Sequence, residues 1–556
     1  MHIRREFSIE LNRYYLSIHV NDFSSFIKSD FRDGMLFDLS PERAQRNAEE
    51  SQEMLRRIAC WKSLPDLTWE ESVELQIAED FCRYILRNSE NYWYQFNLTH
   101  NTSPLPYVIK RLETYPLEDE AALELYVNLL NQFPDKLADM VWKLQEQERR
   151  GILLPAEQQS ITLDLLHSLL QGNGSLLLPW NRPSVHLSFS STCRRCIEQA
   201  VLSLNQCLEK VMDYLRRDYN RAGKEVLPGL CHVPGGLECY HRQILTYTSY
   251  ALPPEKLHAI GLEELAVTQK KMEEIISQLG LSLDIPAFQA YLQKERICFD
   301  DTPEQLQQRF DRVQQRIEPR LKEFFLRQPK ARCRSQALPK EKESSTSWGY
   351  YSVPIGEEKE GVFYYSAADL DSRSQIRTAA IVGHELLPGH HFQTNLIAED
   401  LQLPLIAREH FNTAYADGWA EYSADLLEEM GIYDLYDLYG RYVWDLVLCC
   451  RLVVDTGLNA MGWTMAQARA FMRENTILTD GEIFTETLRY SVDMPAQALA
   501  YKFGSLKMHQ LRRRAQAALG ARFDLSAYHE EVLRYGSVPL NILDEIVEHF
   551  IASSHI

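Results

Sequence analysis

The sequence predicts a mainly α protein, a large multi-helical body with one small β-hairpin. Three observations lead to this fold class. Runs with the spacing of helices dominate the first 330 residues, and no fixed-period repeat relates them. Only residues 349–366 have the aromatic and β-branched character of paired strands. No stretch of the 556 residues has the composition of a linker, so we expect tightly packed lobes.

The expected helices begin at recognisable caps. Ser40 is an N-cap residue with Pro41 at the first helical position, which predicts a helix over 41–58. Thr68 and Glu71 have capping-box spacing at the start of a helix over 68–87. Further helical runs cover 121–153, 155–170, 191–217, 254–279 and 303–326. Turns are expected at 172–180 and 234–236, where glycine and proline gather.

The hairpin is expected after a polar loop. Residues 330–347 are polar and basic and predict the loop. The strands are expected over 349–354 and 362–366, joined by a glycine-bounded turn at 356–361. A strand here could offer its edge to an extended substrate, because the hairpin directly precedes a histidine-rich segment.

Charge and composition exclude several classes of partner. The net charge is −19, from 59 basic and 78 acidic residues, and no basic cluster is present. Nucleic acid and anionic membranes are therefore not expected as partners. The chain shows no signal peptide and no transmembrane span, which predicts a cytoplasmic protein. The eleven irregularly spaced cysteines are typical of reduced, buried thiols.

Residues 381–393 are the chemically richest segment, with three histidines and a carboxylate within eight residues. They follow a run with helical spacing, so His384 and Glu385 are expected to project from a packed helix. A neutral imidazole is a good zinc ligand, and the neighbouring carboxylate can take a proton from water that the metal activates. The segment therefore predicts a metal site.

The second histidine ligand depends on Pro388. In the usual H-E-x-x-H motif both imidazoles share one helical face, but here proline stands at the fourth position after His384. Proline has no N–H to donate, so we expect the helix to bulge or break at Pro388-Gly389. The break favours His390 as second ligand. A straight helix would return His391 to that face roughly 10.5 Å along the axis, and His391 stays the alternative.

A downstream helix expected over 414–430 offers the third ligand. Asp417 and Glu421 are four residues apart and share a face, so either could complete two histidines with an oxygen ligand. Such a site keeps a position open for catalysis. The neighbouring Trp419 and Tyr422 indicate a buried surrounding, which favours a ligand role for Asp417 over a place on a solvated acidic face. We therefore expect a helical lobe over 1–330 and a metal-site lobe over 331–556, packed as one body.

Four motifs resemble one known family. They are His384-Glu385-x-x-Pro388-Gly389-His390-His391-x-Gln393, Asp417-Gly-Trp-Ala420, Arg451-Leu-Val-Val-Asp-Thr-Gly457, and Arg489-Tyr490 with Pro495-Ala-Gln-Ala-Leu-Ala-Tyr501. Over nearly the whole chain the sequence is similar to the largely uncharacterised "domain of unknown function" family number 885. That family is grouped with the thermolysin-like (gluzincin) metallopeptidases, so the resemblance implies a mostly helical hydrolase.

Three positions depart from the family's pattern. The family usually has glutamate where this chain has Asp417, histidine near Asn459, and glycine where Ala496 stands. The resemblance keeps Asp417 in the position of the third ligand. Its side chain is one methylene shorter than glutamate, so Glu421 stays open as the alternative.

The remaining roles follow from metal-assisted hydrolysis. Glu385 would accept a proton from the activated water and pass it to the leaving amine. The oxyanion needs a further donor, for which the clan suggests Tyr501 first and Tyr490 second. Arg489 would pair a substrate carboxylate, or else form a salt bridge to Asp455 or Glu486. Gln393 would orient a ligand imidazole.

Two functions are thus open. The first is a zinc-dependent hydrolase that holds one zinc ion and cleaves a peptide or amide bond in a small substrate. The alternative is a degenerate site that binds a peptide-like ligand or performs a specialised biosynthetic reaction. Glu385 favours hydrolysis, whereas Asp417 and Asn459 favour the alternative.

Overall fold

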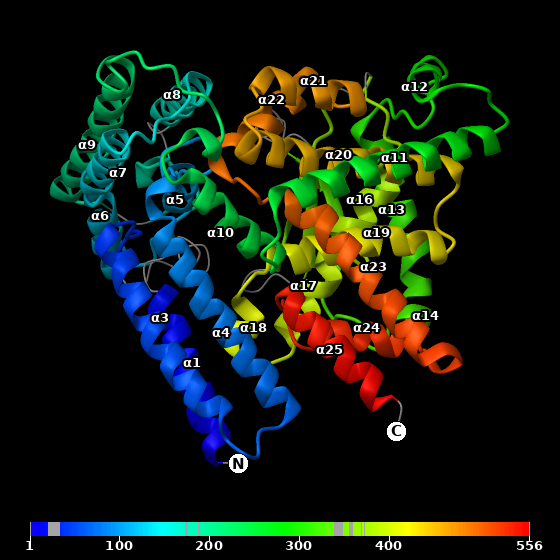
Figure 1. Ribbon diagram of the computed structural model, residues 1–556. Helices are drawn as coiled ribbons and strands as arrows, with labels where there is room; N and C mark the ends of the chain where they lie inside the picture. Colours follow the sequence, from blue (N-terminus) through cyan, green and yellow to red (C-terminus); the bar gives the residue numbers. More distant parts are fainter. Residues whose placement is uncertain are drawn as a thin grey trace. The chain divides into compact units, whose positions relative to one another are not determined.

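Helices dominate the residues that the computed structural model describes, which are 2–19, 34–172, 176–186, 189–338, 349–354, 360–368, 370–371 and 373–554. The described strands form a single three-stranded sheet (Figure 1). The predicted fold class, a mainly α body with a small β element, is therefore confirmed.

The contacts divide the chain into two compact units, each built from separate stretches. Unit 1 contains residues 1–60, 82–239 and 491–495, and unit 2 contains residues 61–81, 240–490 and 496–556. The lobes expected at 1–330 and 331–556 follow the order of the chain, whereas these units do not. The two lobes stay a prediction. The histidine-rich segment lies in unit 2.

The first part of the chain is helical throughout. Its elements are α1 (His2–His19), α3 (Pro41–Lys62), α4 (Trp69–Glu90), η1 (Tyr92–Tyr94), α5 (Leu105–Glu113), α6 (Glu120–Asn131), α7 (Phe133–Arg149), α8 (Ala156–Gly172), η2 (Pro179–Asn181), α9 (Ser191–Arg217), η3 (Leu230–His232) and α10 (Gly236–Thr248). In unit 1 the apolar face of α9, with Ile197, Leu204 and Leu208, joins a core that extends over α5, α6 and α7.

Local sequence explains where these helices begin. The backbone N–H of Cys193 donates to Ser190, which caps α9, and the helix begins at Ser191 as expected. Thr68 and Glu71 form the expected capping box at α4, since each side chain accepts from the other's backbone N–H. The single run expected over 121–153 is instead two helices, α6 and α7. Pro134 lies in the first turn of α7, where its missing N–H costs least.

The remaining elements belong to unit 2, except that the π-helical turn η5 crosses the division. They are α11 (Pro254–Gln278), α12 (Ile285–Lys294), α13 (Pro303–Ile317), η4 (Glu318–Arg320), α14 (Leu321–Phe324), β1 (Arg332–Ala337), β2 (Gly349–Ser352), β3 (Glu360–Tyr365), α16 (Thr378–Glu385), α17 (His390–Glu399), α18 (Leu405–Glu409), α19 (Thr413–Glu429), α20 (Leu435–Ala460), α21 (Met465–Asn475), α22 (Asp480–Leu488), η5 (Arg489–Asp493), α23 (Leu499–Leu519), η6 (Gly520–Arg522), α24 (Leu525–Leu533) and α25 (Leu540–Ser553). The run expected over 303–326 is interrupted at Pro319, within η4.

The sheet confirms the predicted hairpin and corrects the predicted loop. β3 lies in the centre, antiparallel to β2 and parallel to β1. Residues 356–359, most of the turn expected at 356–361, lie outside the described residues. The loop expected over 330–347 is wrong at Arg332–Ala337, which form β1. The polar sequence of β1 has no strand signal of its own, and its pairing is supplied by β3.

Packed helices form much of unit 2. α20 lies along α11, and α19 packs on both α16 and α23 (Figure 1). A Cβ on Gly418 of α19 would stand 2.6 Å from the backbone of Gly504 in α23, so this close crossing requires glycine. The packing leaves nearly every residue of α19 buried. Its polar side chains are therefore fixed by their neighbours.

Candidate metal centre

The helix break expected at Pro388 is present. α16 ends at Glu385 and α17 begins at His390, with a cis peptide bond between Leu387 and Pro388. A Cβ on Gly389 would stand 1.9 Å from the carbonyl oxygen of His384, so only glycine fits this turn. The Pro388 carbonyl accepts a hydrogen bond from Trp419 Nε1 at 3.0 Å, which ties the break to α19.

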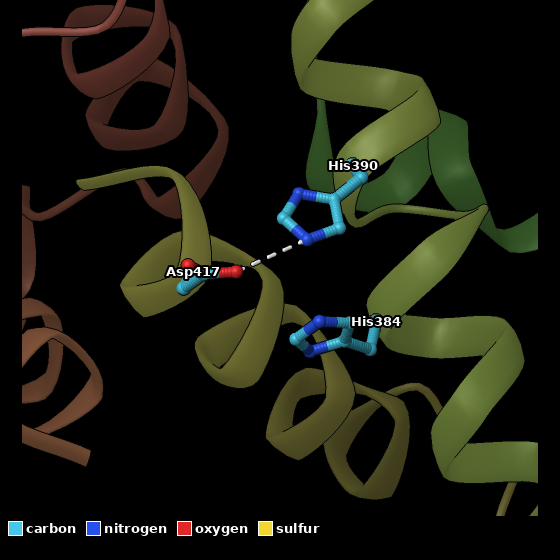
Figure 2. A group of neighbouring side chains, drawn as sticks. All are labelled: His384, His390 and Asp417. Atoms are coloured by element: carbon cyan, nitrogen blue, oxygen red, sulfur yellow. Dashed lines mark ion pairs between the residues drawn. The ribbon is translucent and has the colours of Figure 1, made fainter. Parts of the chain in front are cut away.

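The break brings His384 and His390 to one place, facing Asp417 on α19. One ligand atom from each of the three residues lies within 4.8 Å of the other two. The two imidazole rings are 4.7 Å apart, and His390 Nε2 is 3.3 Å from Asp417 Oδ1. Figure 2 shows the three side chains pointing toward a common space, the histidines from α16 and α17.

This set of donors fits a zinc ion. Two neutral imidazoles and one carboxylate are a known ligand set of catalytic zinc, which keeps a further position for water or substrate. One ligand atom of each residue lies within 4.8 Å of the other two. Asp417 reaches the histidines although it is shorter than glutamate.

Glu421 lies outside the cluster of three residues and contacts His384. Its Oε1 lies 3.1 Å from His384 Nδ1 and accepts from Trp444 Nε1 at 2.8 Å, and its Oε2 lies 3.0 Å from Arg441 Nη2. Burial alone would raise the pKa of Glu421, but Arg441 and His384 outweigh it and lower the pKa to about 2. A charged carboxylate on Nδ1 would fix the ring and leave Nε2 for a metal. The structure thus places Glu421 as a support of His384.

His391, the alternative second ligand, is engaged elsewhere. Its Nδ1 lies 2.8 Å from the hydroxyl of Tyr351 in β2, and its Nε2 lies 3.1 Å from the carbonyl oxygen of Ala331. Burial lowers its pKa, so the ring is neutral and links α17 to the sheet.

Glu385 lies beside the cluster and lines a cavity of about 270 Å³. Burial raises the pKa of its carboxyl above the usual value, although His384 and His390 act in the opposite direction. A raised pKa makes the carboxylate a better proton acceptor. The position suits a general base.

The two candidate tyrosines differ in position. Tyr501 lines the cavity, and its hydroxyl accepts from Gln497 Nε2 at 3.2 Å. Burial raises the pKa of Tyr501, so the phenol keeps its proton and can donate. Tyr490 is not among the residues that line the cavity, and its hydroxyl accepts from Arg451 Nε at 3.0 Å.

Arg489 and Gln393 lie away from the reacting groups. Arg489 donates to Gln497 at 2.9 Å and to Glu486 at 3.2 Å, which is the salt-bridge alternative considered for it. It is absent from the cavity lining. Gln393 is buried in α17, and among the described residues no hydrogen bond joins its amide to either candidate histidine ligand. Glu421 occupies the orienting position instead.

Two of the three positions that depart from the family's pattern, Asn459 and Ala496, lie outside the cavity. Asn459 is buried in α20, where its amide donates to the Asp455 and Tyr490 carbonyls, each at 3.0 Å. Ala496 has a positive φ of 68°, a conformation that favours glycine, and its N–H donates to the Asp455 carboxyl. Only Asp417 bears directly on the metal cluster.

Sequence reasoning missed four residues around the site. They are Arg377, Arg441, Trp444 and Arg451, of which three line the cavity and Arg441 supports Glu421. None lies in a motif with metal-ligand spacing. The four-residue spacing of Asp417 and Glu421 was a signal for Glu421, since it indicated that both face the same neighbours.

The fold and this cluster define a mainly helical protein with a two-histidine, one-carboxylate centre. The chain belongs to the family described as "Bacterial protein of unknown function (DUF885)", whose model matches residues 24–547. No curated protein matches the chain.

Solved structures show the same fold. "The putative lipoprotein from Colwellia psychrerythraea" superposes with a TM-score of 0.87 at 24% identity, covering 98% of this chain and 99% of that one. "A putative lipoprotein of unknown function from Shewanella oneidensis" gives a TM-score of 0.75 at 15% identity, again covering 98% and 99%. An M32 carboxypeptidase from Deinococcus radiodurans gives 0.42 at 12% identity, covering 98% and 95%, a score that supports no conclusion about this chain.

The expectation of a cytoplasmic protein is corrected by these comparisons. The similar structures from Colwellia psychrerythraea and Shewanella oneidensis are each described as a putative lipoprotein, which points away from the cytoplasm. Among the described residues, no helix is long and apolar enough to cross a membrane.

Proposed function

We propose that this protein is a zinc-dependent hydrolase that cleaves a peptide or amide bond, with chemistry of the thermolysin-like (gluzincin) kind. The convergence of His384, His390 and Asp417 carries the proposal, because the three ligand atoms meet beside a cavity that Glu385 also lines. These three residues would hold one zinc ion. Bound zinc would polarise the scissile carbonyl and make water a usable nucleophile near neutral pH.

Glu385 moves the proton in this proposal. It accepts a proton as the water oxygen adds to the carbonyl carbon, and it then gives that proton to the leaving nitrogen. The C–N bond breaks, and the products are a carboxylic acid and an amine. The buried surroundings that raise the pKa of Glu385 favour the first half of this transfer, in which the carboxylate accepts the proton.

The other side chains stabilise the oxyanion and hold the metal-binding residues in position. Tyr501 keeps its phenolic proton and donates to the oxyanion that forms on the carbonyl oxygen. Glu421 holds His384 through Nδ1, and Arg441 with Trp444 keeps the Glu421 carboxylate in place. The cavity lining also includes apolar side chains, among them Phe363, against which a substrate could pack.

A metal analysis followed by a peptide screen tests this function. Purified protein should hold one zinc ion per chain, and incubation with a mixture of short peptides should yield products that mass spectrometry identifies. Treatment with a chelator should abolish cleavage, and added zinc should restore it. Zinc binding without any cleavage would instead favour the alternative, a degenerate site that binds a peptide-like ligand or serves a biosynthetic reaction.

A further inference from the structure

The side-chain amide of Gln497 links the Tyr501 hydroxyl to Arg489. Tyr501 lines the cavity, and its hydroxyl oxygen lies 3.2 Å from Gln497 Nε2. On the other side of the same amide, Arg489 Nη1 lies 2.9 Å from Gln497 Oε1. The amide therefore has a different polar partner on each side.

Arg489 determines the orientation of this amide. A guanidinium has five N–H donors and no acceptor, so the amide atom that faces it must be the carbonyl oxygen. The opposite orientation would place the N–H groups of Gln497 against those of Arg489. The Nε2 group is therefore on the side of Tyr501, where it can only donate. The Tyr501 oxygen must accept this hydrogen bond.

A hydroxyl that accepts from Gln497 keeps its own proton for another partner. A phenol has one O–H donor and can accept at the same time. Among the described residues, the Tyr501 hydroxyl has no hydrogen-bond partner other than Gln497. Tyr501 lines the cavity together with the metal cluster, so its proton is left for a group bound there. A donor to an oxyanion needs this arrangement.

Glu486 anchors both arginines that contact this system. Arg489 donates to Glu486 at 3.2 Å, and Arg451 contacts it twice, at 2.9 and 3.1 Å. Burial alone would raise the pKa of Glu486, but Arg451 and Arg489 outweigh it and lower the pKa. The Arg451 guanidinium lies 4.7 Å from the centre of the Tyr501 ring. Arg451 therefore packs on the ring, and Arg489 acts on the hydroxyl through Gln497.

The turn before α23 fixes the backbone of Gln497. The N–H of the preceding residue, Ala496, lies 3.0 Å from each carboxylate oxygen of Asp455. The N–H of Ala500 donates to the Gln497 carbonyl at 3.1 Å. Gln497 itself is buried. Its side chain therefore extends from a backbone that is held on both sides.

We propose that Arg489 and Gln497 are positioning residues for the proposed hydrolysis, because together they leave the Tyr501 proton free to point into the cavity and bind the oxyanion. This inference rests on the proposed hydrolase function and deepens it. Neither Arg489 nor Gln497 lines the cavity, so both act through Tyr501. Arg489 thus has a role other than the pairing with a substrate carboxylate that its motif suggested.

Gln497→Glu reverses the polarity of the contact with little change in shape. A carboxylate accepts from Arg489 as the amide does, but it would also accept the Tyr501 proton and so withdraw it from the cavity. On a peptide that the wild type cleaves, kcat should fall at least about tenfold with little change in KM, because the oxyanion loses its donor. Gln497→Met leaves the proton free and should reduce kcat less.

A double-mutant cycle separates positioning from the added charge. Gln497→Glu should not reduce kcat further once Tyr501→Phe has removed the hydroxyl, whereas a general effect of the new charge would persist. Gln510→Glu adds the same charge at an exposed position of α23 and should cleave normally. Equal losses in folded Gln497→Met and Gln497→Glu, or full additivity with Tyr501→Phe, would overturn the proposal.

Arg489→Met tests the other end of the link. Without the guanidinium, the Gln497 amide can turn over and accept the Tyr501 proton, so kcat should fall. The same substitution should have little further effect in a Gln497→Met background, where no amide is left to turn. A loss of kcat that persists undiminished in that background would mean that Arg489 acts by another route.

A binding measurement tests the proposal without cleavage. Phenylmethylphosphonate has a tetrahedral oxyanion, whereas phenylmethanethiol is a zinc ligand without one. In zinc-loaded protein, calorimetry should show that Gln497→Glu weakens phosphonate binding at least about tenfold and changes thiol binding less, because a charge-assisted hydrogen bond is lost. In a Tyr501→Phe background this selective loss should disappear. No phosphonate binding by the wild type, or equal losses for both ligands, would contradict the proposal.

The two kinds of measurement distinguish this inference from the proposed function. A protein that shows the selective loss of phosphonate binding but cleaves no peptide would fail only the hydrolase function. A protein that holds zinc and cleaves peptides, yet responds equally to Gln497→Glu and Gln497→Met, would fail only the positioning role.

Discussion

Two buried carboxylates on neighbouring helices differ in charge. Glu421 on α19 and Asp455 on α20 both have fully buried side chains. Burial would raise the pKa of Glu421, yet Arg441 and His384 lower it to about 2. Burial raises the pKa of Asp455 to about 7, because its donors are the neutral Tyr240 hydroxyl at 2.6 Å and backbone and amide N–H groups. The charge of the neighbours, more than depth, decides whether a buried carboxyl is ionised.

The difference in charge distinguishes the carboxylate beside the candidate metal site from the one in the surrounding core. Ionised Glu421 can hold the proton on His384 Nδ1 and leave Nε2 for a metal. Asp455 binds the N–H of Ala496 and accepts from Tyr240 without facing the cavity. The departures at Asn459 and Ala496 lie beside Asp455, so we expect them to affect stability more than chemistry.

The largest expected effect concerns Glu385, a carboxylate that faces the cavity. Glu385→Gln keeps its size and removes the base, so kcat/KM on a cleaved peptide should fall by about 10²–10⁴. Zinc content should stay at the wild-type level. Glu428→Gln, at an exposed position of α19, is the control and should cleave normally. A wild-type rate in Glu385→Gln would remove Glu385 from the proton transfer.

Tyr501 should give the next largest effect. Tyr501→Phe removes the donor for the oxyanion, so kcat should fall by about 10²–10³ with little change in KM. Tyr490→Phe removes a hydroxyl outside the cavity and should reduce kcat less. Steady-state kinetics of both variants check the order. A larger loss in Tyr490→Phe would reverse the assignment of the two tyrosines.

Glu421 should change metal affinity moderately. Glu421→Gln keeps the shape but removes the charge that holds His384, so zinc affinity should weaken by about 10–100-fold while binding persists. A titration of zinc against a competing chelator measures this, with circular dichroism as the check on folding. If the folded variant held no zinc at all, Glu421 would be a ligand rather than a support.

The substitution of Asp455 should give the smallest effect, and this effect should be on stability alone. Its folded pKa of about 7 exceeds the ordinary value of 3.8, so the folded protein binds the extra proton between these pH values. The stabilisation is fully present below the unfolded pKa and is lost as the pH rises through about 7. Wild type should therefore lose stability relative to Asp455→Asn between about pH 5 and about pH 8. Urea unfolding at both pH values measures the difference.

An exposed carboxylate provides the matched control for that experiment. Asp66→Asn removes a solvent-exposed group and should show no such change relative to wild type. A stability difference between wild type and Asp455→Asn that is independent of pH would mean that Asp455 is ionised throughout this range.

Much of the fold could be predicted, because its signals are local. α9 covers residues 191–217 as expected, and the aromatic residues of β2 and β3 predicted the hairpin. β1 could not be predicted, because a polar strand is stabilised by its pairing with β3 rather than by its own residues. The break between α16 and α17 was visible in Pro388 and Gly389, since proline lacks the N–H that a helix needs.

For the candidate site, too, some residues could be predicted from the sequence and others could not. His384, His390 and Asp417 carry ligand types at informative spacing, and the structure brings them together. The pairing of Arg377 and Arg451 on the Trp444 ring could not be predicted, because the two arginines are more than seventy residues apart in the sequence. Arg489 was the visible candidate within a motif, yet it binds Glu486. The residues that were not predicted are brought together by long-range packing, which produces no periodic pattern in the sequence.

Zinc titration of wild type and Asp417→Ala tests the central claim most directly. The account predicts one tightly bound zinc ion per wild-type chain and loss of most bound zinc in folded Asp417→Ala, because two histidines alone would remain. Glu428→Ala, on the exposed side of the same helix, should bind zinc as wild type does. Undiminished zinc affinity in Asp417→Ala, or no zinc binding by the wild type, would contradict the proposed metal centre.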